Sequence, residues 1–162
     1  MIAYLDASAV VKRYLVERGS RETIALSADS EMIATSIVSR AEVAAALAKA
    51  ARIGLVKHDV ARNAQRRFAE DSPDLVRVPV TEALAERAEG LAWEHGLRGY
   101  DAVQLASALT WQESVGEEIV LATFDQQLWE AAKRTGVRAW PDQLPGTTSE
   151  PEEPQDKEEG TS

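Results

Sequence analysis

Four acidic residues stand where an α/β fold could gather them at one place: Asp6, Glu42, Asp101 and Asp125. Asp6 directly follows an apolar run, residues 2–5, and Asp125 comes just after another, residues 118–123. The carboxyl ends of parallel strands meet at one edge of a sheet, and α/β proteins bind their ligands outside that edge. We therefore expect Asp6 and Asp125 to share it.

Glu42 and Asp101 belong to segments that approach the same edge. Glu42 lies one turn into a helical segment, residues 38–53, and Asp101 begins a helix behind a glycine-bearing link, residues 96–99. Four carboxylates at one rim would raise each other's pKa unless a cation lay among them. Oxygen ligands favour Mg²⁺ or Mn²⁺, and such an ion can activate water and stabilise an attack at phosphorus.

Each acid also has a purely structural interpretation. An Asp at the start of a helix commonly accepts hydrogen bonds from free backbone N–H groups, which applies to Asp6, Asp101 and Asp125. Glu42 could pair with Ser39 in a capping box. The four acids together indicate a functional site more strongly than any one of them does alone.

Strand and helix patterns alternate along the chain. Apolar runs predict strands at residues 2–5, 31–36, 75–80, 118–123 and 137–140, with segments of helical spacing between them. This alternation predicts an α/β fold in which helices cover both faces of a mostly parallel sheet. We expect a single domain over residues 1–140, because a chain of 162 residues is long enough for one full core.

The composition limits the chemistry and the location. The chain has no Cys and only two His, so a thiolate or histidine-rich metal site is not expected. The net charge is −9, yet seven of the 27 acidic residues lie in residues 142–162, beside one of the 18 basic residues. Pro, Gly, Ser, Thr and Glu dominate residues 141–162, which predicts a disordered acidic tail. The sequence has neither a long apolar span nor a signal-like N-terminus, so we expect a cytoplasmic protein without a membrane segment.

Four segments resemble the PIN-domain ribonucleases, and within that family the VapC-type toxins of type II toxin–antitoxin pairs. The segments are residues 4–14, 39–43, 99–108 and 122–125, and they stand in the family's order. The resemblance covers about residues 2–140, the expected domain. It implies a PIN-like three-layer α/β/α sandwich with a central, mostly parallel sheet of four to five strands.

The resemblance also implies a metal-dependent endoribonuclease. The four acids match the family's positions around one or two Mg²⁺ or Mn²⁺ ions, with Asp6 and Asp101 as the firmest ligands. Glu42 would bind a metal or orient the attacking water. Asp125 would act through a water or a second metal.

Further expectations follow from the same resemblance. Ser8 and Thr123 match hydroxyl positions that support the carboxylates by hydrogen bonds. The family implies an RNA substrate, a homodimer and a cognate antitoxin protein that neutralises the enzyme.

Basic residues cluster after the segment that carries Glu42. Six lie within nineteen residues, against the single acid Asp59: Lys49, Arg52, Lys57, Arg62, Arg66 and Arg67. They could follow an RNA phosphate backbone or receive an acidic partner. The alternative is an ordinary solvated helix face.

Other functions remain open from the residues alone. A haloacid-dehalogenase-like phosphotransferase also uses an Asp at a strand end, but it needs a second Asp where this chain has Ser8. A receiver domain would need an Asp at the end of the third strand, near Val80. A catalytically idle RNA-binding or protein-interaction module of the same fold is the main alternative.

Overall fold

Five short strands form one parallel sheet. They are β1 (Ile2–Leu5), β2 (Met32–Ser36), β3 (Val76–Val78), β4 (Val120–Ala122) and β5 (Arg138–Trp140). Their order in the sheet is β3-β2-β1-β4-β5, and every neighbouring pair is parallel. The first strand of the sequence is therefore the central strand of the sheet, and its carboxyl end lies between the carboxyl ends of β2 and β4. The computed structural model describes residues 1–145.

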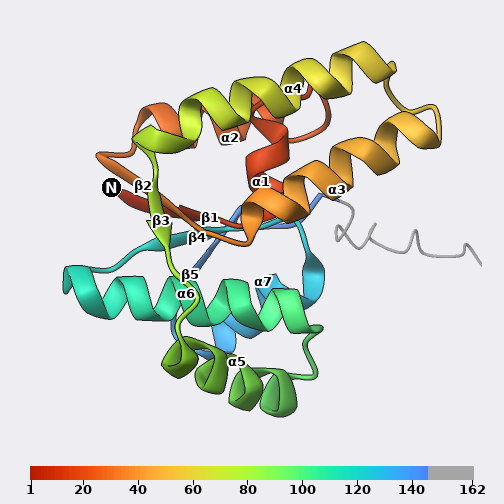
Figure 1. The fold of residues 1–162 in the computed structure, drawn as a ribbon. Coiled ribbons are helices and arrows are strands. Elements are labelled where there is room, and N and C mark those ends of the chain that lie inside the picture. The colour runs from red at the N-terminus through yellow and green to blue at the C-terminus, as the bar shows by residue number, and fades with distance from the viewer. Residues whose placement is uncertain (146–162) are drawn as a thin grey trace, which may run out of the picture.

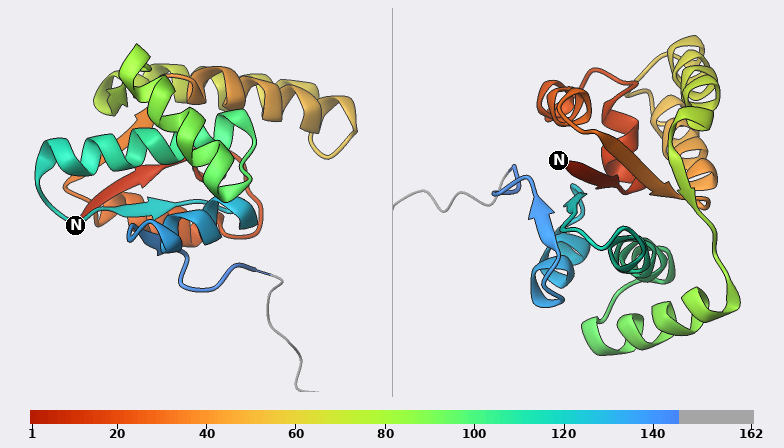
Figure 2. Two further views of the ribbon diagram at one scale, coloured as in Figure 1. Left: turned by 90° about the horizontal axis from the view of Figure 1, so that it is seen from below. Right: turned by 90° about the vertical axis from the view of Figure 1, so that its left-hand side faces the viewer.

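Helices cover both faces of the sheet, as Figures 1 and 2 show. One layer contains α1 (Ala7–Lys12), α2 (Ser20–Ala28), α3 (Ser39–Arg52) and α4 (His58–Asp71), followed by a short 3₁₀ helix, η1 (Ser72–Asp74). The other layer contains α5 (Glu82–His95), α6 (Gly99–Val115) and α7 (Gln126–Arg134). The predicted three-layer α/β/α sandwich with a parallel sheet is confirmed.

The alternation of side chains along β1 divides the core in two. Ile2 and Tyr4 pack into the cluster beneath α5, α6 and α7, whereas Ala3 and Leu5 pack into the cluster beneath α1 to α4. Successive residues of a strand point to opposite faces, so a strand with helices on both sides must be apolar throughout. Tyr4 and Leu5 are wholly buried. This packing holds the carboxyl end of β1, where Asp6 follows, in a fixed position.

The link between α5 and α6 is fixed at both ends. Gly96 ends α5 with φ of 64°, a left-handed conformation that suits glycine at the end of a helix. Leu97 is buried with only 7% exposure, and Arg98 is the N-cap residue of α6. The link therefore brings the first turn of α6, which carries Asp101, to a defined place.

The chain continues past β5 across the surface. The Trp129 indole N–H donates to the Pro141 carbonyl oxygen at 2.7 Å, and Leu144 is buried. The remainder of the predicted tail, residues 146–162, lies outside the described residues, so the boundary at residue 140 stays a prediction. Within residues 1–145, no helix has both the length and the apolar composition to span a bilayer.

Candidate active site

Asp6 is buried at the point where β1 turns into α1. Only 4% of the residue is exposed, and its Oδ1 caps α1 by accepting a hydrogen bond from the Ala9 backbone N–H at 2.9 Å. The Ser8 hydroxyl also donates to Oδ1, and the Thr123 hydroxyl donates to Oδ2, each at 2.7 Å. An ionised carboxylate offers about four acceptor positions. Asp6 therefore acts as a helix cap and still retains acceptor capacity for a ligand.

The two hydroxyls also tie the end of β1 to the end of β4. The Phe124 backbone N–H donates to Ser8 Oγ at 2.8 Å, and the Asp125 N–H donates to Thr123 Oγ1 at 3.1 Å. Asp125 in turn caps α7, accepting from the Leu128 N–H at 2.9 Å. Asp6 and Asp125 thus lie at the same edge of the sheet, joined through hydrogen bonds of Thr123.

Glu42 is held by Gln104 of α6, and its helix is not capped by a side chain. The N-cap position of α3 is Val38, and Ser39 is turned inward instead of capping. The Gln104 amide donates to Ser39 Oγ at 2.9 Å and to Glu42 Oε2, while its carbonyl oxygen accepts from the Tyr4 hydroxyl at 2.6 Å. One buried glutamine therefore connects the central strand, α3 and α6, and fixes the orientation of the Glu42 carboxylate.

Asp101 lies in the first turn of α6 and does not occupy the N-cap position. Its residue is 8% exposed, and Arg98 Nε donates to its Oδ2 at 2.9 Å. The Arg98 Nη2 donates to Asp125 Oδ2 at 3.0 Å. A single guanidinium group thus joins two of the four predicted site acids.

The four acids influence one another's charge. Burial raises the pKa of Asp6 from 3.8 to about 6, and the negative charge of Asp125 adds to this increase. Burial likewise raises the pKa of Glu42 from 4.5 to about 7, with added repulsion from Asp6 and Asp101. The pKa of Asp101 is also raised, chiefly by burial, although its bond to Arg98 works against the rise. The acids form one electrostatic cluster, in which the Arg98 guanidinium compensates part of the negative charge.

The cluster fits a hard divalent cation in kind and in charge. Carboxylate oxygens are the ligands that Mg²⁺ and Mn²⁺ prefer, and a nearby cation would lower these raised pKa values. As the side chains of residues 1–145 are placed, however, no group of three or more His, Cys, Asp or Glu stands close enough together to hold a metal ion. Arg98 occupies oxygens of two acids that such an ion would need.

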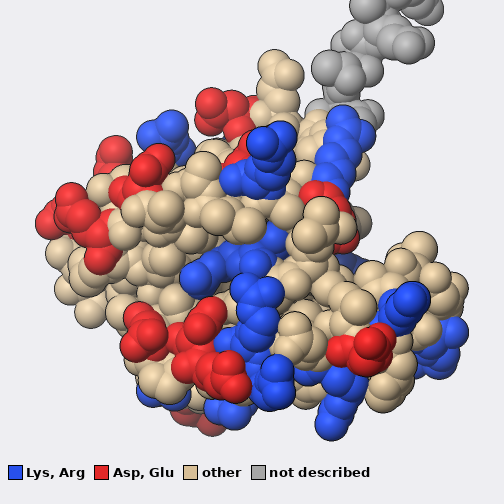
Figure 3. Space-filling model, turned by 90° about the horizontal axis from the view of Figure 1, so that it is seen from above, with Lys and Arg blue, Asp and Glu red and all other residues tan. Residues whose placement is uncertain are grey.

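The six predicted RNA-contacting residues are all exposed on α3, α4 and the loop between them: Lys49, Arg52, Lys57, Arg62, Arg66 and Arg67. Figure 3 shows the helical layer that contains α4, with Lys and Arg side chains gathered near the middle of this face. Exposed cations of this kind can approach a phosphate backbone.

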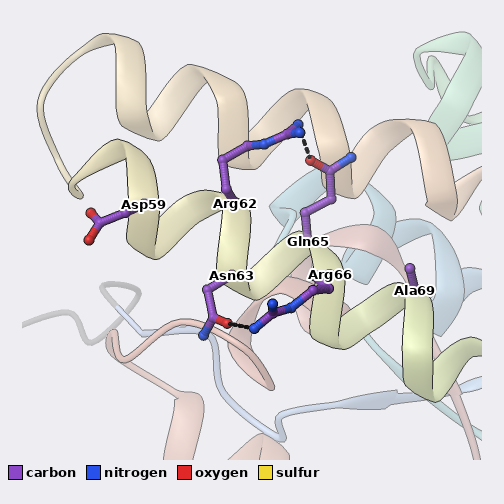
Figure 4. A pocket seen from close by; sticks show the side chains of 6 residues that line it. All are labelled: Asp59, Arg62, Asn63, Gln65, Arg66 and Ala69. Atoms are coloured by element: carbon purple, nitrogen blue, oxygen red, sulfur yellow. Dashed lines mark hydrogen bonds between the residues drawn. The ribbon is translucent and has the colours of Figure 1, made fainter.

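A shallow hollow lies along α4 within this basic region. It has a volume of about 650 Å³, and residues 59–69 of α4 line it. Arg62 bonds to Gln65 at 3.3 Å and Arg66 bonds to Asn63 at 2.8 Å, on different sides of the helix, as Figure 4 shows. None of the four site acids lines this hollow.

Two residues of the site were missed in the sequence. Gln104 sits among apolar neighbours on α6, and a polar residue in that setting is a signal of a buried hydrogen-bond network. Arg98 lies in the link, three residues before Asp101, which is a spacing that allows an ion pair. Neither signal identifies the partners contributed by α3 and α7.

Comparisons with known proteins identify the family of this chain. A family model described as the PIN domain matches residues 3–134. The chain belongs to the PIN-domain family. The matched residues include all four acids, the two hydroxyl residues and the six basic residues described above.

Among individual proteins, the chain is similar to Ribonuclease VapC45 of Mycobacterium tuberculosis, with 37% identity over 144 residues, 88% of this chain and 97% of the relative. A crystal structure of PAE2754 from Pyrobaculum aerophilum superposes with a TM-score of 0.59 at 25% identity, covering 85% of this chain and 83% of the other. A toxin–antitoxin complex from Klebsiella pneumoniae gives a TM-score of 0.51 at 20% identity, covering 76% and 86%.

Proposed function

We propose that this chain is a metal-dependent endoribonuclease that hydrolyses RNA phosphodiester bonds as the toxin of a toxin–antitoxin pair. The observation that carries the proposal is that burial and neighbouring acids raise the pKa values of Asp6, Glu42 and Asp101, in a chain 37% identical to a protein named Ribonuclease VapC45. Phosphodiester hydrolysis needs an activated water and positive charge at the phosphate, and a carboxylate cluster supplies both by binding divalent cations.

Asp6, Asp101, Glu42 and Asp125 would hold one or two Mg²⁺ or Mn²⁺ ions. Such ions, when bound, supply a more acidic water and positive charge opposite the phosphate. The chain's own contribution is placement: Ser8 and Thr123 fix the Asp6 oxygens. Hydrogen bonds of this kind orient a metal ligand and preserve its geometry.

Glu42 is suited to orient or deprotonate the attacking water. In the metal-free protein burial raises its pKa to about 7, and a bound cation would lower that pKa, so an ionised Glu42 would be available to accept a proton at neutral pH. Gln104 holds one of its oxygens and leaves the other without that constraint. In this proposal Glu42 therefore either binds a cation or receives the proton of the water.

The basic residues of α3 and α4 would guide the RNA. Six exposed cations on one helical pair raise the local potential for a polyanion, which partly offsets the chain's net charge of −9. Lys49, Arg52 and Lys57 would contact the backbone near the turn between the helices. Arg62, Arg66 and Arg67 would contact it along α4.

The proposal extends to partners and location. The Klebsiella structure to which this fold is similar is a toxin–antitoxin complex, which supports a cognate antitoxin for this chain. We also propose a homodimer, because the toxin family implies one, and a cytoplasmic location, where RNA and a protein antitoxin would both be present. Light scattering on the purified chain with and without its neighbouring gene product would test both assemblies.

The direct test is an incubation of purified protein with single-stranded RNA in Mg²⁺ or Mn²⁺, with an EDTA control. We expect cleavage that requires the metal and falls at least about a hundredfold in Asp6→Asn and in Asp101→Asn. Cleavage in EDTA, or cleavage that survives both substitutions, would contradict the mechanism.

A second candidate is an idle RNA-binding or protein-interaction module of the same fold. The observation that favours it is the Arg98 guanidinium, which already neutralises two acids. RNA binding without cleavage in either metal would support this alternative.

A further inference from the structure

Arg98 makes two ion pairs that would compete with a cation for the acids of the proposed metal site. Its Nε lies 2.9 Å from Asp101 Oδ2 and its Nη2 lies 3.0 Å from Asp125 Oδ2. The planar fork of the guanidinium donates to both carboxylates from a fixed geometry. Neither carboxylate oxygen can coordinate a cation from the same direction while it accepts these bonds.

The backbone of Arg98 is anchored, whereas its side chain is open to solvent. Leu97 is buried beside it, and Arg98 begins α6 as its N-cap residue. The side chain itself is 72% exposed, compared with 11% for that of Asp101. Because the guanidinium itself lies largely in water, solvent and salt screen its attraction to the two acids. The guanidinium can therefore leave the acids at small cost without any change in the fold.

We propose that Arg98 is a phosphate-binding residue that exchanges partners: it pairs with Asp101 and Asp125 in the metal-free protein and with the RNA phosphate once cations occupy those acids. This inference rests on the proposed function. Arginine suits the role because its planar fork matches phosphate oxygens as well as it matches carboxylates. Its position beside Asp101 and Asp125 keeps it within reach of a phosphate bound at the same cations.

The first test measures Mn²⁺ binding to the full chain by calorimetry, without RNA. Removing a competitor for two ligands should tighten metal binding, so we expect a dissociation constant about tenfold lower in Arg98→Ala than in the wild type. Arg98→Lys keeps the charge but loses the planar fork and should hold the two acids less firmly, so its Mn²⁺ binding should also tighten, about threefold.

Arg134→Ala is the matched control, because Arg134 is an exposed arginine that pairs with Glu130 on α7. Its Mn²⁺ affinity should stay within about twofold of the wild type. If Arg98→Lys binds Mn²⁺ as the wild type does, the effect of Arg98 is only its charge and the inference is wrong. The inference is also wrong if Arg98→Ala binds Mn²⁺ as tightly as the wild type or more weakly.

The second test measures affinity for a labelled single-stranded RNA by anisotropy, with Ca²⁺ in place of Mg²⁺. We expect Arg98→Ala to bind RNA about tenfold more weakly, opposite in sign to its effect on Mn²⁺. A residue with only a structural role would weaken both ligands together. Unchanged RNA affinity would remove the phosphate-binding half of the inference.

Cleavage by the wild type separates this inference from the proposed function. If the wild type cleaves RNA while the Arg98 variants show none of these changes, only the role of Arg98 is wrong. If the wild type neither binds Mn²⁺ nor cleaves RNA, both conclusions are wrong.

Discussion

At the scale of single residues, Asp6 combines two roles that are usually alternatives. It caps α1 through Oδ1, as an Asp at a helix start commonly does, and its pKa is raised, as are those of Glu42 and Asp101. Three donors make its buried charge tolerable, and they also fix the direction in which its remaining lone pair points. The side-chain placement that lets Asp6 cap α1 is therefore the same one that it would need to bind a metal ion.

The first prediction concerns the hydroxyls that hold Asp6. Thr123→Ala and Ser8→Ala each remove one donor to the carboxylate, so we expect metal affinity and RNA cleavage to fall about tenfold to a hundredfold in each variant. Thr123→Ser keeps the hydroxyl and should retain most activity. A Thr123→Ala enzyme with wild-type kinetics would contradict a supporting role for this side chain.

The second prediction concerns pH. The pKa of Asp6 in the folded protein, about 6, lies above its ordinary 3.8, so the folded state binds more protons than the unfolded state between these values. Stability of the metal-free protein should therefore decrease as pH rises from 4 to 6, with an Asp6 share of about 2 kcal/mol. Asp6→Asn should remove this share. Urea unfolding of both proteins in EDTA at pH 4 and pH 6 measures the difference.

The same pKa values predict the opposite trend for metal binding. Coordination requires ionised carboxylates, and Asp6 and Glu42 ionise near pH 6 and 7. Mn²⁺ affinity should therefore rise between pH 5.5 and pH 7.5. An affinity that is independent of pH over this range would show that neither acid is a ligand.

At the scale of the elements, α6 does the most to build the site. Its first turn carries Asp101, and one turn later Gln104 reaches Tyr4 on β1 and Glu42 on α3. A buried amide with several partners fixes the relative positions of the elements that it joins.

Replacing this glutamine gives the prediction at this scale. Gln104→Ala leaves the buried Tyr4 hydroxyl without its partner, so we expect a loss of about 2 kcal/mol in the free energy of unfolding. Gln126→Ala is the control, because Gln126 is exposed and bonds only within α7 to Glu130. Urea unfolding compares the two. Equal stability of both variants would mean that the network does not support the fold.

The elements themselves were largely predictable from the sequence, and the contacts between them were not. Apolar runs and helical spacing mark the strands and helices, and the parallel topology then brings Asp6 and Asp125 to one edge. Arg98 and Gln104 bond to acids 27 and 62 residues away in the chain. Such contacts depend on how α3, α6 and α7 pack, which periodicity within one segment does not specify.

At the scale of the whole molecule, charge is divided between two surfaces. The acids lie at the sheet edge, while six cations lie on α3 and α4. Cleavage of a polyanionic substrate would use both groups of charges. The cations would attract the phosphate backbone, and the acids would hold the metal ion that acts at one phosphate.

Reversing charge on α4 tests this division. We expect Arg62→Glu, Arg66→Glu and Arg67→Glu together to weaken RNA binding at least about tenfold and to flatten its salt dependence. Mn²⁺ binding should remain close to that of the wild type, because none of the three arginines bonds to the four acids. Lys133→Glu with Arg134→Glu on α7 is the control. RNA affinity that stays unchanged across a salt titration would leave these residues as a solvated helix face.

The central claim is that the four acids hold a divalent cation, and anomalous diffraction from crystals grown with Mn²⁺ tests it most directly. We predict an anomalous peak bounded by Asp6, Asp101, Asp125 and Glu42, with the Arg98 guanidinium no longer paired to Asp101 and Asp125. Crystals that show no peak among these carboxylates at saturating Mn²⁺, with Arg98 still bonded to both acids, would contradict the account.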